Sequence, residues 1–533
     1  MTRPSSPVAQ TLLGVRLVIL GFGMSAATAA VAGCSARAST PADAVIVAIR
    51  VGPNSFDPRV ANDLNSARVA QLVYSSLVDF DDNLQVKPSL AERLDNPDPR
   101  TYIVRLRRGV RFHDGHELTS KDVLYTYESI LDPQFTSPYK AAFRMIASIT
   151  APDDYTVRFT LHEPFPAFPI QLVTPPIVPA GAGDSLRTFP VGTGPYRFVR
   201  YDVDDQVVLA AFDAYYDGLP NNAGVVLKVL PDDTMRGLEL RKGSVDLVIN
   251  DLPPDIVYQF SKENRLRVTT STGMDYAYLG FNMRDPTLDD KRVRQAIGYA
   301  VDYEAIIRYL RRGEARPALT PVPSNSWAFE PNVHQFTHDP ARAKRLLDDA
   351  GYPDPDGDGP LSRLRLSLKT SMTEEFVLQA TVIQQNLREV GIDVDVRSYE
   401  FATFFADVVN GNFQIYTLQW IGGALVDPDI LRRLFHSKEV PPAGFNRGHY
   451  DNSEVDRLID LATRATDNAD RKKYYSEVQK IIAEDAPYVS LWYRTNVTIA
   501  QPALSGLRLG PTSDFQALKD VSKAGTPQQH AAR

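Results

Sequence analysis

The chain has 533 residues, with 58 basic and 65 acidic side chains and a formal net charge of −7 at neutral pH. Because the balance is acidic and no segment is rich in Lys and Arg, we expect no nucleic-acid partner. A single cysteine excludes an intramolecular disulfide and any cysteine-based metal or redox site. A chain of this length ordinarily divides into about two or three domains.

The two ends differ in composition from the rest of the chain. Residues 1–33 have the pattern of a secretory signal peptide, with two arginines and no acid around an apolar, small-residue run at 17–31. This run is too short and wrongly flanked for a stable membrane span. Residues 34–43 are small and polar and predict a flexible tether, and residues 522–533 predict a disordered tail.

Between these ends the hydrophobic pattern predicts strands and helices in alternation. In the first half, strands are expected at 44–49, 102–106 and 155–161, and helices at 65–77 and 123–131. Thr119 and Asp122 form a capping pair ahead of the second helix. The proline-rich stretch 164–179 predicts an irregular connection.

The second half contains the clearest supersecondary pattern. Alternating leucines at 364–368 are followed by an apolar helical stripe over 376–390 and a second alternating run at 392–396. A strand–helix–strand unit of this kind implies a parallel pair with a right-handed crossover. A helix at 339–351, a helix at 401–410 and a strand at 413–420 are also expected. The predicted fold class is therefore α/β with mixed sheets.

Motifs for catalysis or metal binding are absent or incomplete. The cluster 113–117 lies in a predicted turn, and His334 and His338 precede a helix-breaking Asp-Pro pair. Residues 354–359 have EF-hand spacing, but Arg365 stands where the closing glutamate is required. We expect no metal, no cofactor and no catalytic residue. Because acids are plentiful, a hydrolase with paired carboxylates stays an alternative.

The segment Val31-Ala32-Gly33-Cys34 resembles a bacterial lipobox. The resemblance implies that Cys34 receives a diacylglyceryl group and becomes the mature N-terminus, which would anchor the protein to a membrane by lipid. An ordinary signal peptide with a chance cysteine is the alternative.

Several further segments resemble, in order, the solute-binding proteins of peptide-type ABC importers, the dipeptide/oligopeptide/nickel-binding family (extracellular solute-binding family 5). These segments are residues 111–123, 190–196, 280–302, 350–353 and 418–428. The likeness spans about 45–493, and it implies a class II periplasmic-binding-protein fold. Such a fold has two α/β lobes with mixed sheets, a two-strand hinge and an inserted extra domain, and it binds its ligand between the lobes.

Motif order gives the expected domain boundaries. Lobe I is placed at 44–80, 187–275 and 490–521, the extra domain at 81–186, and lobe II at 276–489. The resemblance also implies a set of ligand-facing residues: Asn54, Phe56, Tyr139, Tyr276, Tyr278, Asn282, Trp420, Ile421, Gly422, Gly423, Asp427, Asn446 and Arg447. For each aromatic residue the alternative is packing in the core. Residues 420–423 are expected to form a strand along which an extended ligand pairs.

One position departs from the family pattern. Peptide binders of this family hold the ligand's α-ammonium group on an aspartate a few residues after the tryptophan. This chain has Gly423 and Ala424 there, and Asp427 is the next acid. A buried ammonium group without a carboxylate is costly, so the departure favours non-peptide ligands.

The sequence therefore predicts a monomeric, extracytoplasmic lipoprotein that catalyses nothing. It would capture a peptide or peptide-like solute and deliver it to the permease subunits of an ABC importer. The same fold binding an oligosaccharide or another non-peptide solute is one alternative. A membrane-tethered exported hydrolase and a signalling receptor without transport are the others.

Overall fold

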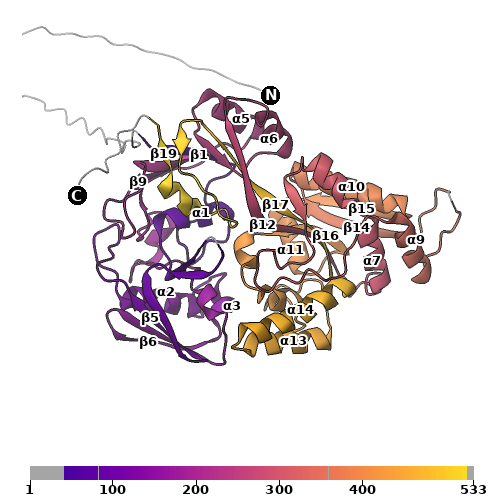
Figure 1. Ribbon diagram of the computed structural model, residues 1–533, viewed down its shortest axis with the longest axis horizontal. Coiled ribbons are helices and arrows are strands. Elements are labelled where there is room, and N and C mark those ends of the chain that lie inside the picture. The colour runs from indigo at the N-terminus through magenta and orange to yellow at the C-terminus, as the bar shows by residue number, and fades with distance from the viewer. Residues whose placement is uncertain (1–40, 42, 82, 358, 525–533) are drawn as a thin grey trace, which may run out of the picture. The chain divides into compact units, whose positions relative to one another are not determined.

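A computed structural model describes residues 41, 43–81, 83–357 and 359–524 (Figure 1). The predicted signal peptide, Cys34 and the tether up to residue 40 lie outside these residues. Within the described ranges, no helix combines the length and the apolar composition that crossing a membrane requires.

A mixed 11-stranded sheet runs through the described chain. Its strands, in order across the sheet, are β15 (Ile392–Tyr399), β14 (Leu364–Ser371), β16 (Ile415–Trp420), β12 (Arg267–Phe281), β17 (Tyr488–Ala500), β11 (Leu247–Ile249), β1 (Val45–Ile49), β10 (Gly224–Val229), β9 (Gln206–Ala211) and β8 (Tyr196–Asp202), while β13 (Ala315–Pro317) pairs with β17. Parallel and antiparallel neighbours both occur, so the predicted mixed α/β class is confirmed.

The two longest strands, β12 and β17, belong to both halves of this sheet (Figure 1). Residues 267–272 of β12 pair with 495–500 of β17, whose end also pairs with β11. Residues 276–280 pair with 488–493, and on the other side residues 276–281 pair with β16. The register shifts between these two parts, at Gly273, where a Cβ atom would lie 2.3 Å from the carbonyl oxygen of Arg494. These strands are the expected two-strand hinge.

We call lobe I the part built on β1 and β8–β11. Its helices are α1 (Leu64–Val73), α5 (Asp233–Lys242) and α6 (Pro254–Phe260). Branched side chains of β1 and β10 alternate into a core with α1, including Val47, Leu72 and Leu227. The predicted helix 65–77 is too long, because Tyr74 is extended and its hydroxyl donates to the Phe56 carbonyl at 3.0 Å.

The chain returns to lobe I at its C-terminal end. β18 (Leu504–Ser505) pairs there with β19 (Ser522–Lys523). The Lys523 ammonium group forms an ion pair with Asp246 at 2.6 Å. The predicted disordered tail therefore starts too early, because residues 522–524 are held by strand pairing and by this ion pair. Residues 525–533 lie outside the described ranges.

The inserted domain is a four-stranded antiparallel sheet with short helices. Its elements are β4 (Ala91–Asp98), β5 (Thr101–Leu106), β7 (Thr156–Leu161), β6 (Ile146–Asp153), α2 (Ser120–Leu131), α3 (Lys140–Phe143) and α4 (Phe168–Gln171), preceded by the hairpin β2 (Val78–Phe80) and β3 (Val86–Pro88). Its own core reaches from Leu77 to Ile177 and contains Phe112 and Phe159. The predicted cap of α2 is present, since the Thr119 amide donates to the Asp122 carboxylate at 2.8 Å.

We call lobe II the part built on β14–β16. The predicted strand–helix–strand unit is β14, α10 (Glu374–Glu389) and β15, and the two strands are parallel as expected. The remaining helices are α7 (Lys291–Ala300), α8 (Tyr303–Ala305), α9 (Pro340–Asp349), α11 (Phe401–Val409), α12 (Ile430–Phe435), α13 (Ser453–Arg464) and α14 (Asn468–Asp485). Ala380, Ile383 and Leu387 of α10 pack onto this sheet.

Candidate functional site

A cavity of ≈ 500 Å³ is lined by lobe I, the inserted domain and lobe II together. Lobe I contributes α1, the residues after it and the segment 512–516, and the inserted domain contributes α3 and the segment 170–176. Lobe II contributes the end of β16, Gly423 and α12. A cavity of about this volume that joins several domains is a common form of small-molecule site.

Aromatic side chains form part of the cavity wall. The Trp420 ring lies 5.0 Å from the Phe445 ring, and both line the cavity. The indole Nε1 of Trp420 is buried and has no acceptor among the described residues. Tyr139 of the inserted domain lines the same cavity, and its hydroxyl donates a hydrogen bond to the Ala61 carbonyl at 3.1 Å. The wall can therefore pack flat groups, and one indole N–H is unused.

Arg433 is the only arginine or lysine among the residues that line this cavity. Its guanidinium stacks on Phe445 at 4.2 Å from the ring centroid, and no hydrogen bond or ion pair joins it to another described residue. Burial lowers the pKa of Arg433, while Asp429 and Glu439 nearby oppose that shift. A partly desolvated guanidinium with free donors is suited to a bidentate contact with a ligand carboxylate.

Four carboxylates line the same cavity: Asp79, Asp427, Asp429 and Asp514. Asp429 is held by Arg432, with Nε at 3.0 Å and Nη2 at 2.9 Å. Burial raises the pKa of Asp427 to about 6, although Arg471 at 3.5 Å opposes this.

Across the cavity, burial raises the pKa of Asp79 and of Asp514. Gln71 and Thr512 donate to the two carboxylate oxygens of Asp514, whereas Asp79 accepts one hydrogen bond, from the Phe80 amide at 2.8 Å. The cavity thus has more carboxylates than cations, and Asp79 keeps acceptor capacity for a ligand.

Four of the residues expected to face a ligand line this cavity: Tyr139, Trp420, Gly423 and Asp427. A Cβ atom built on Gly423 would meet no other atom within 4 Å. The position therefore has room for a side chain that the chain does not supply.

Other residues expected to face a ligand do not line this cavity, and several of them make packing contacts or hydrogen bonds within the fold. Phe56 is buried against Phe198 and Tyr201, and Asn54 is exposed. Asn282 donates to the carbonyls of Gly411 and Phe413, and its buried amide closes a turn of lobe II.

The tyrosines of β12 are core residues. Tyr278 stacks on Tyr488 with ring centroids 4.1 Å apart. The hydroxyl groups of Tyr276 and Ser490 share a hydrogen bond at 2.7 Å. Asn446 donates to the Tyr450 carbonyl at 2.7 Å. Tyr278 therefore has the surroundings of the core-packing alternative, whereas the buried Tyr276 lines a different cavity, within lobe II.

The expected ligand-pairing strand over 420–423 is wrong in its geometry. β16 ends at Trp420, and residues Gly422–Leu425 form a 3₁₀ turn. The Gly422 amide donates to the Asp275 carboxylate at 2.9 Å, so it is not free for a ligand, and Ile421 is exposed outside the cavity lining.

Arg447 is among the residues expected to face a ligand, but Arg433 and not Arg447 lines this cavity. Arg447 is buried beneath the cavity wall, with its guanidinium 5.0 Å from the Trp420 ring and 5.1 Å from that of Phe405. The only sequence feature that points to Arg433 as a cavity residue is the pair Arg432-Arg433 after Asp429. Since α12 has only 6 residues, periodicity cannot decide which arginine faces the cavity.

Among the described residues, no group of three or more His, Cys, Asp or Glu side chains is arranged to hold a metal. His113 instead bridges a packed loop, because its Nε2 lies 3.0 Å from the Gly194 carbonyl and its Nδ1 lies 3.3 Å from the Gly192 amide. Burial lowers its pKa to about 4, so this imidazole is neutral at pH 7.

Comparison with known proteins agrees with this architecture. The family model for bacterial extracellular solute-binding proteins, family 5 Middle, matches residues 85–441. Glutathione-binding protein GsiB of Pectobacterium atrosepticum is 32% identical over 483 residues, which cover 88% of this chain and 92% of GsiB.

Solved structures of similar proteins share the fold over nearly their whole length. The oligopeptide-binding protein AppA from Bacillus subtilis, in complex with a nonapeptide, has a TM-score of 0.79 and 28% identity, covering 91% of this chain and 100% of AppA. NikZ from Campylobacter jejuni, in complex with Ni(L-His), has a TM-score of 0.79 and 27% identity, with the same coverage.

Proposed function

Because the chain belongs to the bacterial extracellular solute-binding proteins of family 5, we propose that it captures a peptide or peptide-like solute and delivers it to an ABC permease. The observation that carries this proposal is the cavity around Trp420, with one unpaired guanidinium, several carboxylates and aromatic walls. A zwitterionic solute needs groups of both signs, and this cavity supplies both.

The named ligands of relatives support a solute with peptide character. AppA was solved with a nonapeptide and a Helicobacter pylori relative, DppA, with the peptide STSA, whereas GsiB is named for glutathione. In this chain, Arg433 would hold a carboxylate of the solute, and Asp427 together with Asp79 would accept its ammonium group. Asp427 and Asp79 would thus take the role of the ammonium-binding aspartate that family peptide binders have at the position of Gly423.

A non-peptide solute is the second candidate, and Gly423 is the observation that favours it. Without a carboxylate at this position, an ammonium group has no dedicated partner at the end of β16. NikZ, solved in complex with Ni(L-His), is a relative whose bound ligand is not a peptide.

The proposal also covers how the protein is held in the cell envelope. Lipidation of Cys34 would hold a monomer at the outer face of the membrane, near the permease, with residues 35–43 as the tether. The domain boundaries at 80/81, 186/187, 275/276 and 489/490 are part of this proposal.

The test is native mass spectrometry of the chain from Ser35 onward, followed by release of any bound solute on denaturation. A ladder of peptide masses supports the proposal, and a sugar or another defined non-peptide mass rejects its peptide part. With the released solute or a synthetic copy, Arg433→Met should raise the dissociation constant by roughly 10- to 100-fold. Arg388→Met, which removes an exposed arginine of α10, should leave it unchanged.

A further inference from the structure

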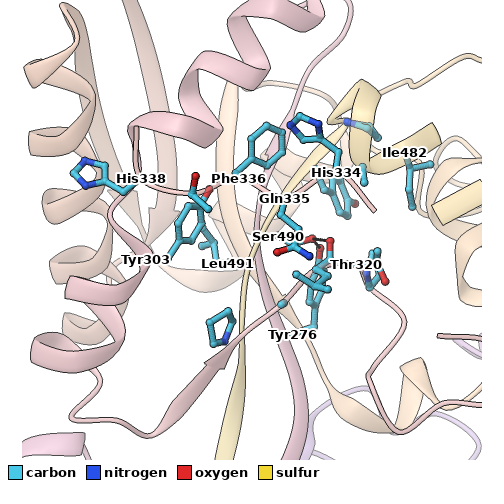
Figure 2. Close-up of a pocket in the computed structure, with 18 of the residues that line it drawn as sticks. Tyr276, Tyr303, Thr320, His334, Gln335, Phe336, His338, Ile482, Ser490 and Leu491 are labelled. Atoms are coloured by element: carbon cyan, nitrogen blue, oxygen red, sulfur yellow. Dashed lines mark hydrogen bonds between the residues drawn. The ribbon is translucent and has the colours of Figure 1, made fainter. Parts of the chain in front are cut away.

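A second cavity, of ≈ 530 Å³, lies within lobe II and shares no lining residue with the first (Figure 2). Its lining comes from the two hinge strands, from α8 and α14, and from two loops at 317–321 and 334–338. The close-up shows Tyr276 and Ser490 of the hinge strands on one side and Phe336 and His334 of the second loop on the other.

Aromatic and proline side chains form the walls of this second cavity. The aromatic residues are Tyr276, Tyr303, Phe336, Phe435 and Tyr488. The hydroxyl groups of the hinge and α8 tyrosines already have partners: Tyr276 with Ser490 at 2.7 Å, and Tyr303 with the Gly298 carbonyl at 2.7 Å. A ligand would therefore meet the faces and edges of these rings, not their polar atoms.

Two carboxylates line the cavity. Asp302 and Glu304 line it on either side of Tyr303, and no lysine or arginine is among its lining residues. Asp302 accepts from the Ala305 amide at 2.9 Å, and its other oxygen lies 3.5 Å from His338 Nδ1. Glu304 is exposed and makes no hydrogen bond or ion pair within the described ranges.

The histidine at the far end does not balance these acids. His334 lies between two partners, with Nε2 3.0 Å from the Tyr299 hydroxyl and Nδ1 3.0 Å from Glu484. Burial lowers the pKa of His334, which disfavours the charged form of its ring, although Glu484 opposes this shift. The cavity thus combines aromatic walls with a carboxylate, that of Glu304, which has no partner among the described residues, and these two features attract an organic cation.

We propose that this second cavity binds a small organic amine with an aromatic or otherwise flat apolar body. The ammonium group would lie at Asp302 and Glu304, and the body would pack against Phe336, Tyr303 and the proline-rich loop 317–321. Because the two cavities have separate linings, this site is independent of the solute proposed above.

The proposal is tested with tryptamine and with indole-3-acetate, which share a ring and differ in charge. Titration calorimetry on the chain from Ser35 onward should show tryptamine binding to one site and at least tenfold weaker binding of indole-3-acetate. Glu304→Gln should weaken tryptamine binding about fivefold, since one charged partner is lost. Glu374→Gln, an equal charge change at an exposed position on α10, should not alter it.

Three results would overturn the proposal: no binding of tryptamine, equal binding of both probes, or a Glu304→Gln variant that binds like the parent. Asp79→Asn and Phe336→Ala then locate the probe, because Asp79 is a proposed ammonium partner in the first cavity. Weaker tryptamine binding in Phe336→Ala but not in Asp79→Asn supports the second cavity. The reverse pattern puts the probe in the first cavity and rejects this site without affecting the proposed solute capture.

Discussion

Gly423 lines the solute cavity from lobe II but supplies no side chain to it. A Cβ atom there meets nothing within 4 Å, and the residue lines the cavity beside Trp420. Gly423→Asp should therefore fold normally and add a carboxylate facing the solute. For peptides with a free α-ammonium group we expect about tenfold tighter binding, as for one added charge-assisted hydrogen bond.

Gly423→Asn is the matched control for this change, because it has the same shape without the charge. Binding of both variants is measured by calorimetry with the free peptide and with its N-acetylated form. If Asn tightens binding as much as Asp does, or if acetylation makes no difference, the carboxylate does not contact the ammonium group.

Asp427 makes stability depend on pH in a direction opposite to that of most carboxylates. Burial raises its pKa from 3.8 to about 6, so between these values the folded chain binds more protons than the unfolded chain. The free energy of unfolding therefore falls as pH rises through this window. The loss is nearly complete about one pH unit above the folded pKa, and it amounts to about 3 kcal/mol, from 1.36 kcal/mol per pKa unit.

The measurement compares urea unfolding of the parent with that of Asp427→Asn at several pH values. From pH 4 to pH 7, the free energy of unfolding of the parent should fall relative to that of Asp427→Asn. A difference that stays constant with pH would show that the pKa of Asp427 is the same in the folded and the unfolded chain. Below about pH 6, protonation of Asp427 should also weaken binding of any solute whose ammonium group it holds.

At the scale of elements, Gly273 permits the close approach of the two hinge strands. A Cβ atom at this position would lie 2.3 Å from the Arg494 carbonyl oxygen and 2.9 Å from Asn496 Oδ1. Since both are backbone or hydrogen-bonded atoms, the strands must separate to admit it. Gly273→Ala should lower the free energy of unfolding by roughly 1–3 kcal/mol, as overpacking does.

Gly510→Ala serves as the comparison, because its Cβ atom would meet nothing within 4 Å. Its unfolding free energy should stay within about 0.5 kcal/mol of the parent. Urea unfolding of both variants measures the contrast, and equal effects would mean that Gly273 is not needed for strand contact.

Local sequence patterns predicted elements better than they predicted the site. The unit β14–α10–β15 followed from two alternating runs and one apolar stripe, because these patterns reflect burial within a single segment. Trp420 and Asp427 were found through a family resemblance. Arg433, Asp79 and Asp514 were missed, because the cavity joins residues hundreds of positions apart, and nothing local marks a side chain that faces a distant segment.

At the scale of the whole molecule, contacts between the inserted domain and lobe II enclose the solute cavity. Arg144 after α3 lies 3.2 Å from Glu439, and Arg464 of α13 lies 3.8 Å from Glu163. The chain from Ser35 onward contains no cysteine. Cysteines introduced as Glu163→Cys and Arg464→Cys can thus be joined by a short bifunctional thiol reagent without competing sites.

Joining these positions should slow both entry and release of the solute, by roughly tenfold or more, if the two parts must separate to open the cavity. Stopped-flow Trp420 fluorescence before and after cleavage of the crosslink measures the rates. The doubly substituted chain without reagent is the control. Unchanged rates in the crosslinked form would mean that the solute enters by another route.

The path of the chain through lobe I has a consequence for the order of synthesis. β11 lies between β1 and β17, so strands near both ends of the chain complete this sheet. Asn222 also donates to the carbonyls of Leu518 and Val521. A ribosome must therefore translate almost the whole message before lobe I can close, and domains fold as units. The nascent chain stays without a finished first lobe during most of its elongation, which suits a polypeptide that has to be threaded across a membrane before it folds.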